Sequence, residues 1–155
     1  MKFGFLAAGL AAALATAAIA QDAEDPFADA VEARHGLMLL MAQNLGTLGS
    51  MAKGETAYDS AVAGKAADNI AALASVLGMD QFPAGSEYGK SADSFALPAI
   101  WTDQTDFVSK ITALNEASNA MTADAKKDLA SLKAGMNSVG GACSACHKAY
   151  RQPEE

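Results

Sequence analysis

Two sets of side chains that recur in alternating steps of four and three residues constrain the fold of this chain most strongly. One set is Phe27, Val31, Arg34, Met38, Met41, Leu45 and Leu48. The other is Leu129, Leu132, Met136, Val139, Cys143, Cys146 and Tyr150. This spacing places each largely apolar set on one face of an α-helix, which is the pattern of helices that pack in bundles.

Residues that start and stop helices divide the chain into four helices with almost no strand. Asp25 and Pro26 suit a helix start, and Gly54 suits a helix end. The expected helices run from Pro26 to about Lys53, from Asp59 or Ser60 to Leu77, from Pro98 or Thr102 to about Met121, and from a turn at residues 122–124 to about Arg151. Short connections make successive helices antiparallel, so we expect an all-α, antiparallel up-down-up-down four-helix bundle.

Residues 1–20 have the pattern of a secretory signal peptide that is cleaved after export. Lys2 gives a positive start, an apolar run follows, and Ala18-Ile19-Ala20 is a small-residue cleavage site. The alternative is an N-terminal membrane anchor, but the cleavage site directly behind the run favours removal. We therefore expect one domain at residues 21–155, exported to the periplasm and without a membrane span.

The balance of charge restricts the partners of the mature protein. The formal net charge is −7, and loss of Lys2 with the signal peptide makes it −8. An acidic protein is a poor candidate for binding nucleic acid. The expected partners are redox proteins with basic faces.

The segment Cys143-Ser144-Ala145-Cys146-His147 carries the chemistry of the last helix. Two thiols three positions apart lie on one side of a helix and can form thioethers with the two vinyl groups of one haem. His147 follows Cys143 by four positions, shares its face, and can bind the iron. Spacing and residue types match the attachment of one covalent haem c.

Three other interpretations of the two cysteines are weaker. A thioredoxin-like dithiol, and with it a thiol-disulfide oxidoreductase, would need a βαβ setting that the pattern lacks. A zinc site needs four ligands, and the only histidines are His35 and His147. A simple disulfide leaves the flanking residues unexplained.

The residues that flank the motif add to the haem interpretation. Gly140 and Gly141 lie inside the expected helix, where each costs about 1 kcal/mol relative to alanine. A flat macrocycle against that helix would account for both. Arg151 follows His147 by four residues and should pass close to its ring, although a cation at a helix C-terminus is also favourable on its own.

The segment from Val139 to Arg151 strongly resembles the C-terminal signature of the class II c-type cytochromes, the cytochrome c′ family. The resemblance extends over the expected mature chain, through residues 48–54, Phe82-Pro83 and residues 97–101. It implies a four-helix bundle with the haem buried between the helices. It also implies a protein that is a homodimer or a monomer.

Arg34 interrupts the apolar face of the first helix, where an unpaired guanidinium is costly. The resemblance implies that Arg34 binds a haem propionate, and the alternative is that it extends to solvent. His35 stands where the family often has glutamine, and we expect it to contact a propionate or solvent. Iron ligation by His35 is a further alternative.

Met38 lies one turn further along the same face and should point toward the iron from the side opposite His147. The resemblance leaves two roles open for it. In a low-spin branch of the family a methionine here is the sixth ligand, and in most members a bulky residue leaves the iron five-coordinate. Met41 is a second sulfur on this face, for which filling of the core is the default role. We expect Trp101 to pack near the haem ring.

These observations favour a periplasmic monohaem c-type cytochrome that acts in electron transfer, and not an enzyme. A Met/His ligand pair raises the reduction potential and suits that function. The alternative is a five-coordinate haem protein that binds nitric oxide or carbon monoxide and sequesters the gas. No catalytic arrangement of residues points to another activity.

Overall fold

The computed structural model describes residues 24–153. The signal peptide predicted at residues 1–20 lies outside the described residues. The helices are α1 (Ala28–Lys53), α2 (Ser60–Val76), the 3-10 helix η1 (Met79–Gln81), α3 (Ala99–Thr102), α4 (Gln104–Lys127) and α5 (Leu129–Tyr150).

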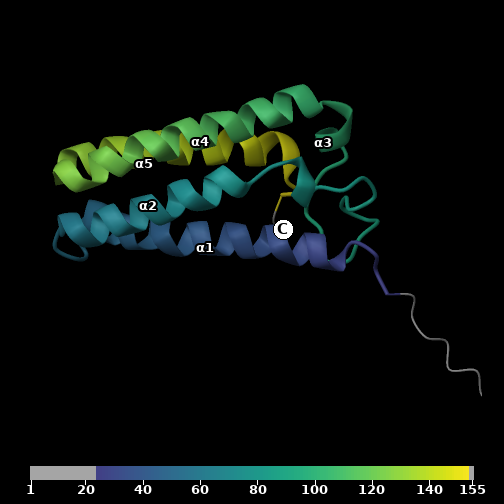
Figure 1. Cartoon of the computed structure of the whole chain (residues 1–155), viewed down its shortest axis with the longest axis horizontal. Coiled ribbons are helices and arrows are strands. Elements are labelled where there is room, and N and C mark those ends of the chain that lie inside the picture. The colour runs from purple at the N-terminus through teal and green to yellow at the C-terminus, as the bar shows by residue number, and fades with distance from the viewer. Residues whose placement is uncertain (1–23, 154–155) are drawn as a thin grey trace, which may run out of the picture.

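The four long helices form an antiparallel bundle (Figure 1). Helix α1 packs on α2, α2 on α4, α4 on α5, and α5 returns to α1. The predicted all-α four-helix bundle is therefore confirmed. None of the described helices is long and apolar enough to cross a membrane.

Two of the predicted helix boundaries follow directly from their capping residues. Gly54 has a left-handed backbone (φ 78°) and its N–H donates to the carbonyl of Met51, which ends α1. The Asp59 carboxylate accepts hydrogen bonds from the N–H groups of Ala61 and Val62 and starts α2.

The first helix starts slightly later than predicted, and the last helix ends slightly earlier. Asp25 caps a turn at residues 26–27 by accepting a hydrogen bond from the N–H of Phe27, and α1 begins only at Ala28. At the other end α5 stops at Tyr150, because Arg151 is extended and forms an isolated bridge with Ala96.

The third and fourth helices differ more from the prediction. The third breaks at Asp103, whose side chain accepts from the N–H of Asp106 and starts α4 separately from α3. The turn predicted at residues 122–124 is wrong. Helix α4 continues through it because Met121 and Ala125 are both fully buried, and Asp128 then caps α5 by accepting from the N–H of Ser131.

The predicted apolar faces of α1 and α5 do point inward, but unevenly. Val31, Leu48, Leu132 and Val139 are at most 3% exposed. Met38, Cys143 and Cys146 are only partly buried. Packing is therefore less complete at the end of the bundle that holds these sulfur-containing residues.

The connection between α2 and α3, residues 77–98, closes that end of the molecule. Its Leu97 N–H donates to the carbonyl of Tyr150, and the N–H of Gln152 donates to the carbonyl of Phe95. The Asp25 carboxylate accepts from the Ser91 hydroxyl and the N–H of Ala92. The connection is thus fastened both to the start of α1 and to the end of α5.

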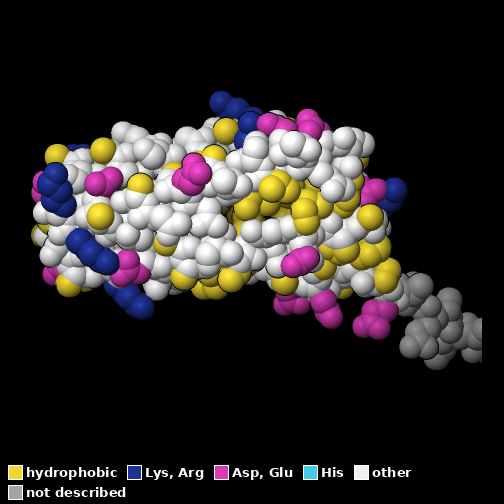
Figure 2. All heavy atoms as spheres, turned by 45° about the horizontal axis from the view of Figure 1, so that its top comes forward, with side chains coloured by type: hydrophobic (Ala, Val, Ile, Leu, Met, Phe, Trp, Pro, Cys, Tyr) yellow, Lys and Arg dark blue, Asp and Glu magenta, His cyan; other side chains and the backbone are white. Residues whose placement is uncertain are grey.

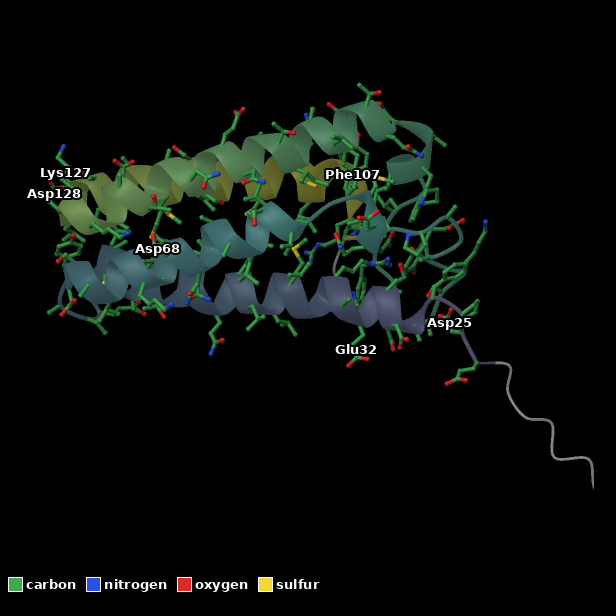
Figure 3. All side chains as sticks on the ribbon, viewed as in Figure 1. Asp25, Glu32, Asp68, Phe107, Lys127 and Asp128 are labelled. Carbon is green, nitrogen blue, oxygen red and sulfur yellow. The ribbon has the colours of Figure 1, made fainter. Side chains whose placement is uncertain are left out.

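The two ends of the bundle differ in character. Lys127 and Asp128, at the junction of α4 and α5, lie at the end remote from Asp25 and the connection (Figure 3). On the face shown in Figure 2, hydrophobic side chains gather toward the end that carries the connection.

Candidate haem site

A cavity of about 160 Å³ opens between α1, α4, α5 and the connection. A single buried water needs only about 10–15 Å³ on this measure, so the space is far larger than a packing defect. Its walls are mainly apolar, with Phe82, Ile100, Phe107 and Ile111 among the lining side chains. Such a cavity suits a large apolar ligand that is oriented by a few polar groups.

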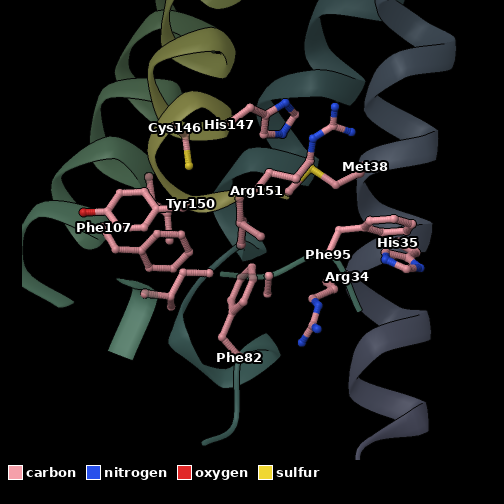
Figure 4. Close-up of a pocket in the computed structure, with 14 residues that line it drawn as sticks. Arg34, His35, Met38, Phe82, Phe95, Phe107, Cys146, His147, Tyr150 and Arg151 are labelled. Atoms are coloured by element: carbon pink, nitrogen blue, oxygen red, sulfur yellow. The ribbon is translucent and has the colours of Figure 1, made fainter. Parts of the chain in front are cut away.

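Helix α5 brings the attachment residues to this cavity. Cys146, His147 and Tyr150 line it from α5, while Met38 and His35 line it from α1 (Figure 4). Cys143 is partly buried one helical turn before His147 and packs against the core without lining the cavity. Both cysteines are free of disulfide bonds.

Burial shifts the acid-base behaviour of both thiols. It raises the pKa of Cys143, and it raises the pKa of Cys146 to about 11, with a smaller contribution from Cys143. Thiols of exchange enzymes have lowered pKa values because the thiolate is the nucleophile. The environment of this pair is therefore unlike that of a dithiol oxidoreductase.

The two methionines of the α1 face lie in different surroundings. Met38 lines the cavity (Figure 4). Met41 is 4% exposed and belongs to the hydrophobic core without lining the cavity. The structure therefore brings Met38, and not Met41, to the same space as His147.

Arg34 is 4% exposed and lines the cavity with its charge directed at neutral acceptors. Its guanidinium donates to the carbonyl of Gln81 (3.1 Å), to the hydroxyl (2.9 Å) and carbonyl (2.7 Å) of Ser86, and to the hydroxyl of Ser94 (2.7 Å). It also lies 5.1 Å from the ring centroid of Phe82. Burial lowers its pKa from the usual value, but an arginine remains charged.

The remaining predicted residues differ in whether they line the cavity. His35 and Arg151 line it, and the His35 ring lies 6.0 Å from that of Phe95, centroid to centroid. Trp101 does not line it and instead donates from its indole N–H to the carbonyl of Phe82. Gly140 and Gly141 are exposed, and an added Cβ would meet no atom within 4 Å at either position.

Two groups of residues at the site were missed in the sequence analysis. Ser86 and Ser94 give no sequence signal, because they meet Arg34 only through tertiary structure. The Tyr150 hydroxyl donates to Asp106 at 2.8 Å, and Lys110 pairs with the same carboxylate at 3.1 Å. Asp106 and Lys110 are four apart on α4, a spacing that predicts the ion pair but not its contact with Tyr150.

The donor set of the cavity fits a c-type haem. The thiol of Cys146 and the imidazole of His147 line the cavity from α5, with Cys143 one helical turn before His147, the thioether of Met38 lines it from α1, and most of the wall is apolar. Arg34 adds a buried cation with no carboxylate partner among residues 24–153, as an anionic macrocycle would require. Within that same range, no three His, Cys, Asp or Glu side chains gather closely enough to hold a metal ion by themselves.

Comparison with known proteins agrees with this fit. The sequence pattern of the family described as cytochrome c′ matches residues 29–151. The chain belongs to the cytochrome c′ family. Members of this family carry a covalently attached haem c and are periplasmic, and no enzymatic activity is indicated for them.

Individual relatives align with most of this chain. Cytochrome c-554 of Cereibacter sphaeroides is 52% identical, over 91% of this chain and 92% of the relative. The solved structure of cytochrome c′ from Rhodobacter Spheriodes is 34% identical with a TM-score of 0.79, over 83% of this chain and 98% of that one. A nitric oxide complex of a variant of cytochrome c prime from Alcaligenes xylosoxidans is 32% identical with a TM-score of 0.73, over 83% and 97%.

Proposed function

We propose that this cytochrome c′ family protein is an exported, periplasmic monohaem electron carrier and not an enzyme. The observation that carries the proposal is the placement of Met38 and His147, which line one cavity from two different helices. A methionine and a histidine on the two sides of a haem iron favour the reduced state and suit electron transfer. A relative that shares 52% identity bears the name cytochrome c-554.

In this proposal each site residue has a distinct role. Cys143 and Cys146 hold the haem through thioethers, His147 binds the iron, and Met38 is the sixth ligand. When bound, the haem supplies a reversible one-electron change between ferrous and ferric iron. The ring of Tyr150 and the side chains of Phe107 and Ile111 line the cavity and would give the haem apolar contacts.

The surface supports a redox partner of opposite charge. The mature chain carries a formal net charge of −8, which follows from the sequence value of −7 without Lys2. A partner with a basic face would be attracted over about a Debye length, roughly 10 Å at 0.1 M salt. We expect the cytochrome itself to be a homodimer or a monomer.

A second candidate function is the binding of nitric oxide or carbon monoxide by five-coordinate iron. The specific observation in its favour is that a solved relative holds nitric oxide. In this candidate Met38 is a steric residue that does not bind the iron, and its flexible side chain leaves room for a diatomic gas. The two functions therefore differ in what Met38 does.

Replacement of Met38 by alanine tests the electron-carrier proposal, with Met41→Ala as the matched control. Both substitutions shorten a methionine on α1, but only Met38 lines the cavity. We expect Met38→Ala to change the absorption spectrum from low-spin to high-spin and to lower the reduction potential. Met41→Ala should leave both unchanged and lower the free energy of unfolding by about 2–5 kcal/mol.

The same pair of variants can contradict the proposal. If Met38→Ala keeps the spectrum and potential of the parent protein, Met38 is not an iron ligand. The gas-binding candidate then becomes the better account of the site.

A further inference from the structure

Phe95 belongs both to the haem cavity and to the surface of the protein. Its ring lines the cavity and lies 6.0 Å from the ring of His35, centroid to centroid (Figure 4). Phe95 is nevertheless 46% exposed. A protein that docks on Phe95 would therefore be separated from a haem in the cavity by a single side chain.

Two exposed carboxylates flank Phe95. Asp93 precedes it by two residues and has a left-handed backbone (φ 57°), which aspartate tolerates better than most residues. Glu32 precedes His35 by three residues on α1, a spacing that makes the two side chains neighbours. It lies in the second turn of the helix, where a carboxylate gains little from the helix dipole. Neither carboxylate forms a salt bridge within residues 24–153, so both negative charges are available to a partner.

The chain segments that form this end of the molecule are acidic as a whole. Residues 24–35 and 77–98 carry seven acidic residues and two basic ones. They therefore hold five of the eight net negative charges expected for the mature chain. Of the two cations, Arg34 is 4% exposed and Lys90 pairs with Glu87. On the face shown in Figure 2, acidic side chains lie beside the hydrophobic side chains at this end, so the surface fits a partner with a basic face.

We propose that Phe95, with Glu32 and Asp93 beside it, is the docking surface for a redox protein that presents lysine or arginine side chains around an apolar centre. The inference rests on the proposed electron-carrier function. An aromatic centre with a polar rim is the usual anatomy of a protein interface, and opposite charges on the rim speed association. A second copy that docked through the same patch would bring like charges into one interface.

Chemical cross-linking of the haem-loaded protein locates the surface, with a lysine-rich, basic c-type cytochrome as the probe. A carbodiimide joins a carboxylate to a lysine amine in contact with it through an amide bond, and peptide mass spectrometry identifies the joined residues. We expect cross-links to the probe at Glu32 or Asp93. This measurement depends neither on ligation by Met38 nor on electron transfer.

The rate of one-electron exchange with the same probe at low ionic strength tests the two charges. We expect Glu32→Gln/Asp93→Asn to lower the second-order rate constant by roughly threefold to tenfold. The matched control is Glu116→Gln/Asp124→Asn on α4, which changes the net charge equally without touching the cavity. It should change the rate by less than about twofold. In about 1 M salt, where the Debye length is roughly 3 Å, all three proteins should react at the same rate.

Three results would overturn the docking surface. Equal rate losses in the two double variants would show an effect of net charge alone. Cross-links confined to other carboxylates would place the partner elsewhere, and a cross-link from Glu32 or Asp93 to a second copy, without the probe, would show that a dimer covers this face. A high-spin parent that binds carbon monoxide contradicts the electron-carrier function, whereas a low-spin parent without the expected cross-links contradicts only the docking surface.

Discussion

Tyr150 joins the haem cavity to the surface of α4. Its ring lines the cavity and packs edge-on against Phe107, with centroids 5.1 Å apart. Its hydroxyl donates to the Asp106 carboxylate, which also pairs with Lys110. Burial and the hydrogen bond to Asp106 together raise the pKa of Tyr150 to about 12 from 10.0.

This raised pKa predicts a pH dependence of stability. The neutral phenol is favoured in the folded state, so its contribution is fully present below pH 10 and is lost as the pH rises from 10 to about 12. We expect Tyr150→Phe to have a lower thermal midpoint than the parent at pH 8. The midpoint of the variant should also fall less between pH 10 and 12.

A tyrosine with a neutral acceptor provides the control for this measurement. The Tyr58 hydroxyl donates to the backbone carbonyl of Ala125 at 2.9 Å. Tyr58→Phe therefore removes a hydroxyl without removing a contact with a carboxylate. Equal declines for the parent and Tyr150→Phe between pH 10 and 12 would show that the contact with Asp106 does not set this dependence.

At the scale of single residues, the sequence predicts which side chains reach the site better than what they do there. Cys146, His147, Arg34, His35, Met38 and Arg151 all line the cavity. The helical period accounts for Arg34, Met38 and Cys146, which lie on the predicted inner faces. Cys143 follows the same period and does not line the cavity, so the period alone does not decide which residues reach it. The partners of Arg34 could not be predicted, since Ser86 and Ser94 reach it through a long connection that has no regular period.

Among the helices, α4 and α5 approach each other closely at Gly135. An added Cβ there would lie 2.9 Å from Cγ and 3.4 Å from Cα of Met121. Because one of these contacts is with the backbone of Met121, movement of the Met121 side chain alone cannot relieve the overlap. The close packing of these two helices therefore requires glycine at position 135.

We predict that Gly135→Ala lowers the free energy of unfolding by about 1–2 kcal/mol, because overpacking outweighs the gain in helix propensity. Gly46→Ala, on the exposed face of α1, is the control. An added Cβ at Gly46 meets nothing within 4 Å, so this variant should gain up to about 1 kcal/mol. Denaturant unfolding measures both, and a stabilised Gly135→Ala variant would show that α4 and α5 can separate without cost.

The limits of the helices show where prediction from sequence fails at this scale. Gly54 was predicted to end the first helix, and Asp59 or Ser60 to start the second; the structure uses Gly54 and Asp59 as the caps. The last helix was predicted to start from a turn at residues 122–124, but the structure starts it after Asp128. Helix α4 continues past residues 122–124 because Met121 and Ala125 are buried, and α5 therefore starts after Asp128. The sequence did not show this, because burial depends on the assembled bundle.

In the molecule as a whole, the helical bundle and the connection between α2 and α3 have different roles. The four long helices were predictable because each repeats an apolar face that must be buried. The connection was predictable only as an irregular segment. It is nevertheless the part that fixes Phe82, Phe95 and Ala96 at the cavity, through hydrogen bonds to Arg34, Tyr150 and Gln152.

The absorption spectrum of the reduced protein, recorded with and without carbon monoxide, reports directly on the sixth position of the iron. With Met38 and His147 as the ligands, we predict a sharp low-spin spectrum that carbon monoxide does not change. A broad high-spin spectrum that shifts when the gas is added would contradict ligation by Met38 and the electron-carrier function proposed from it.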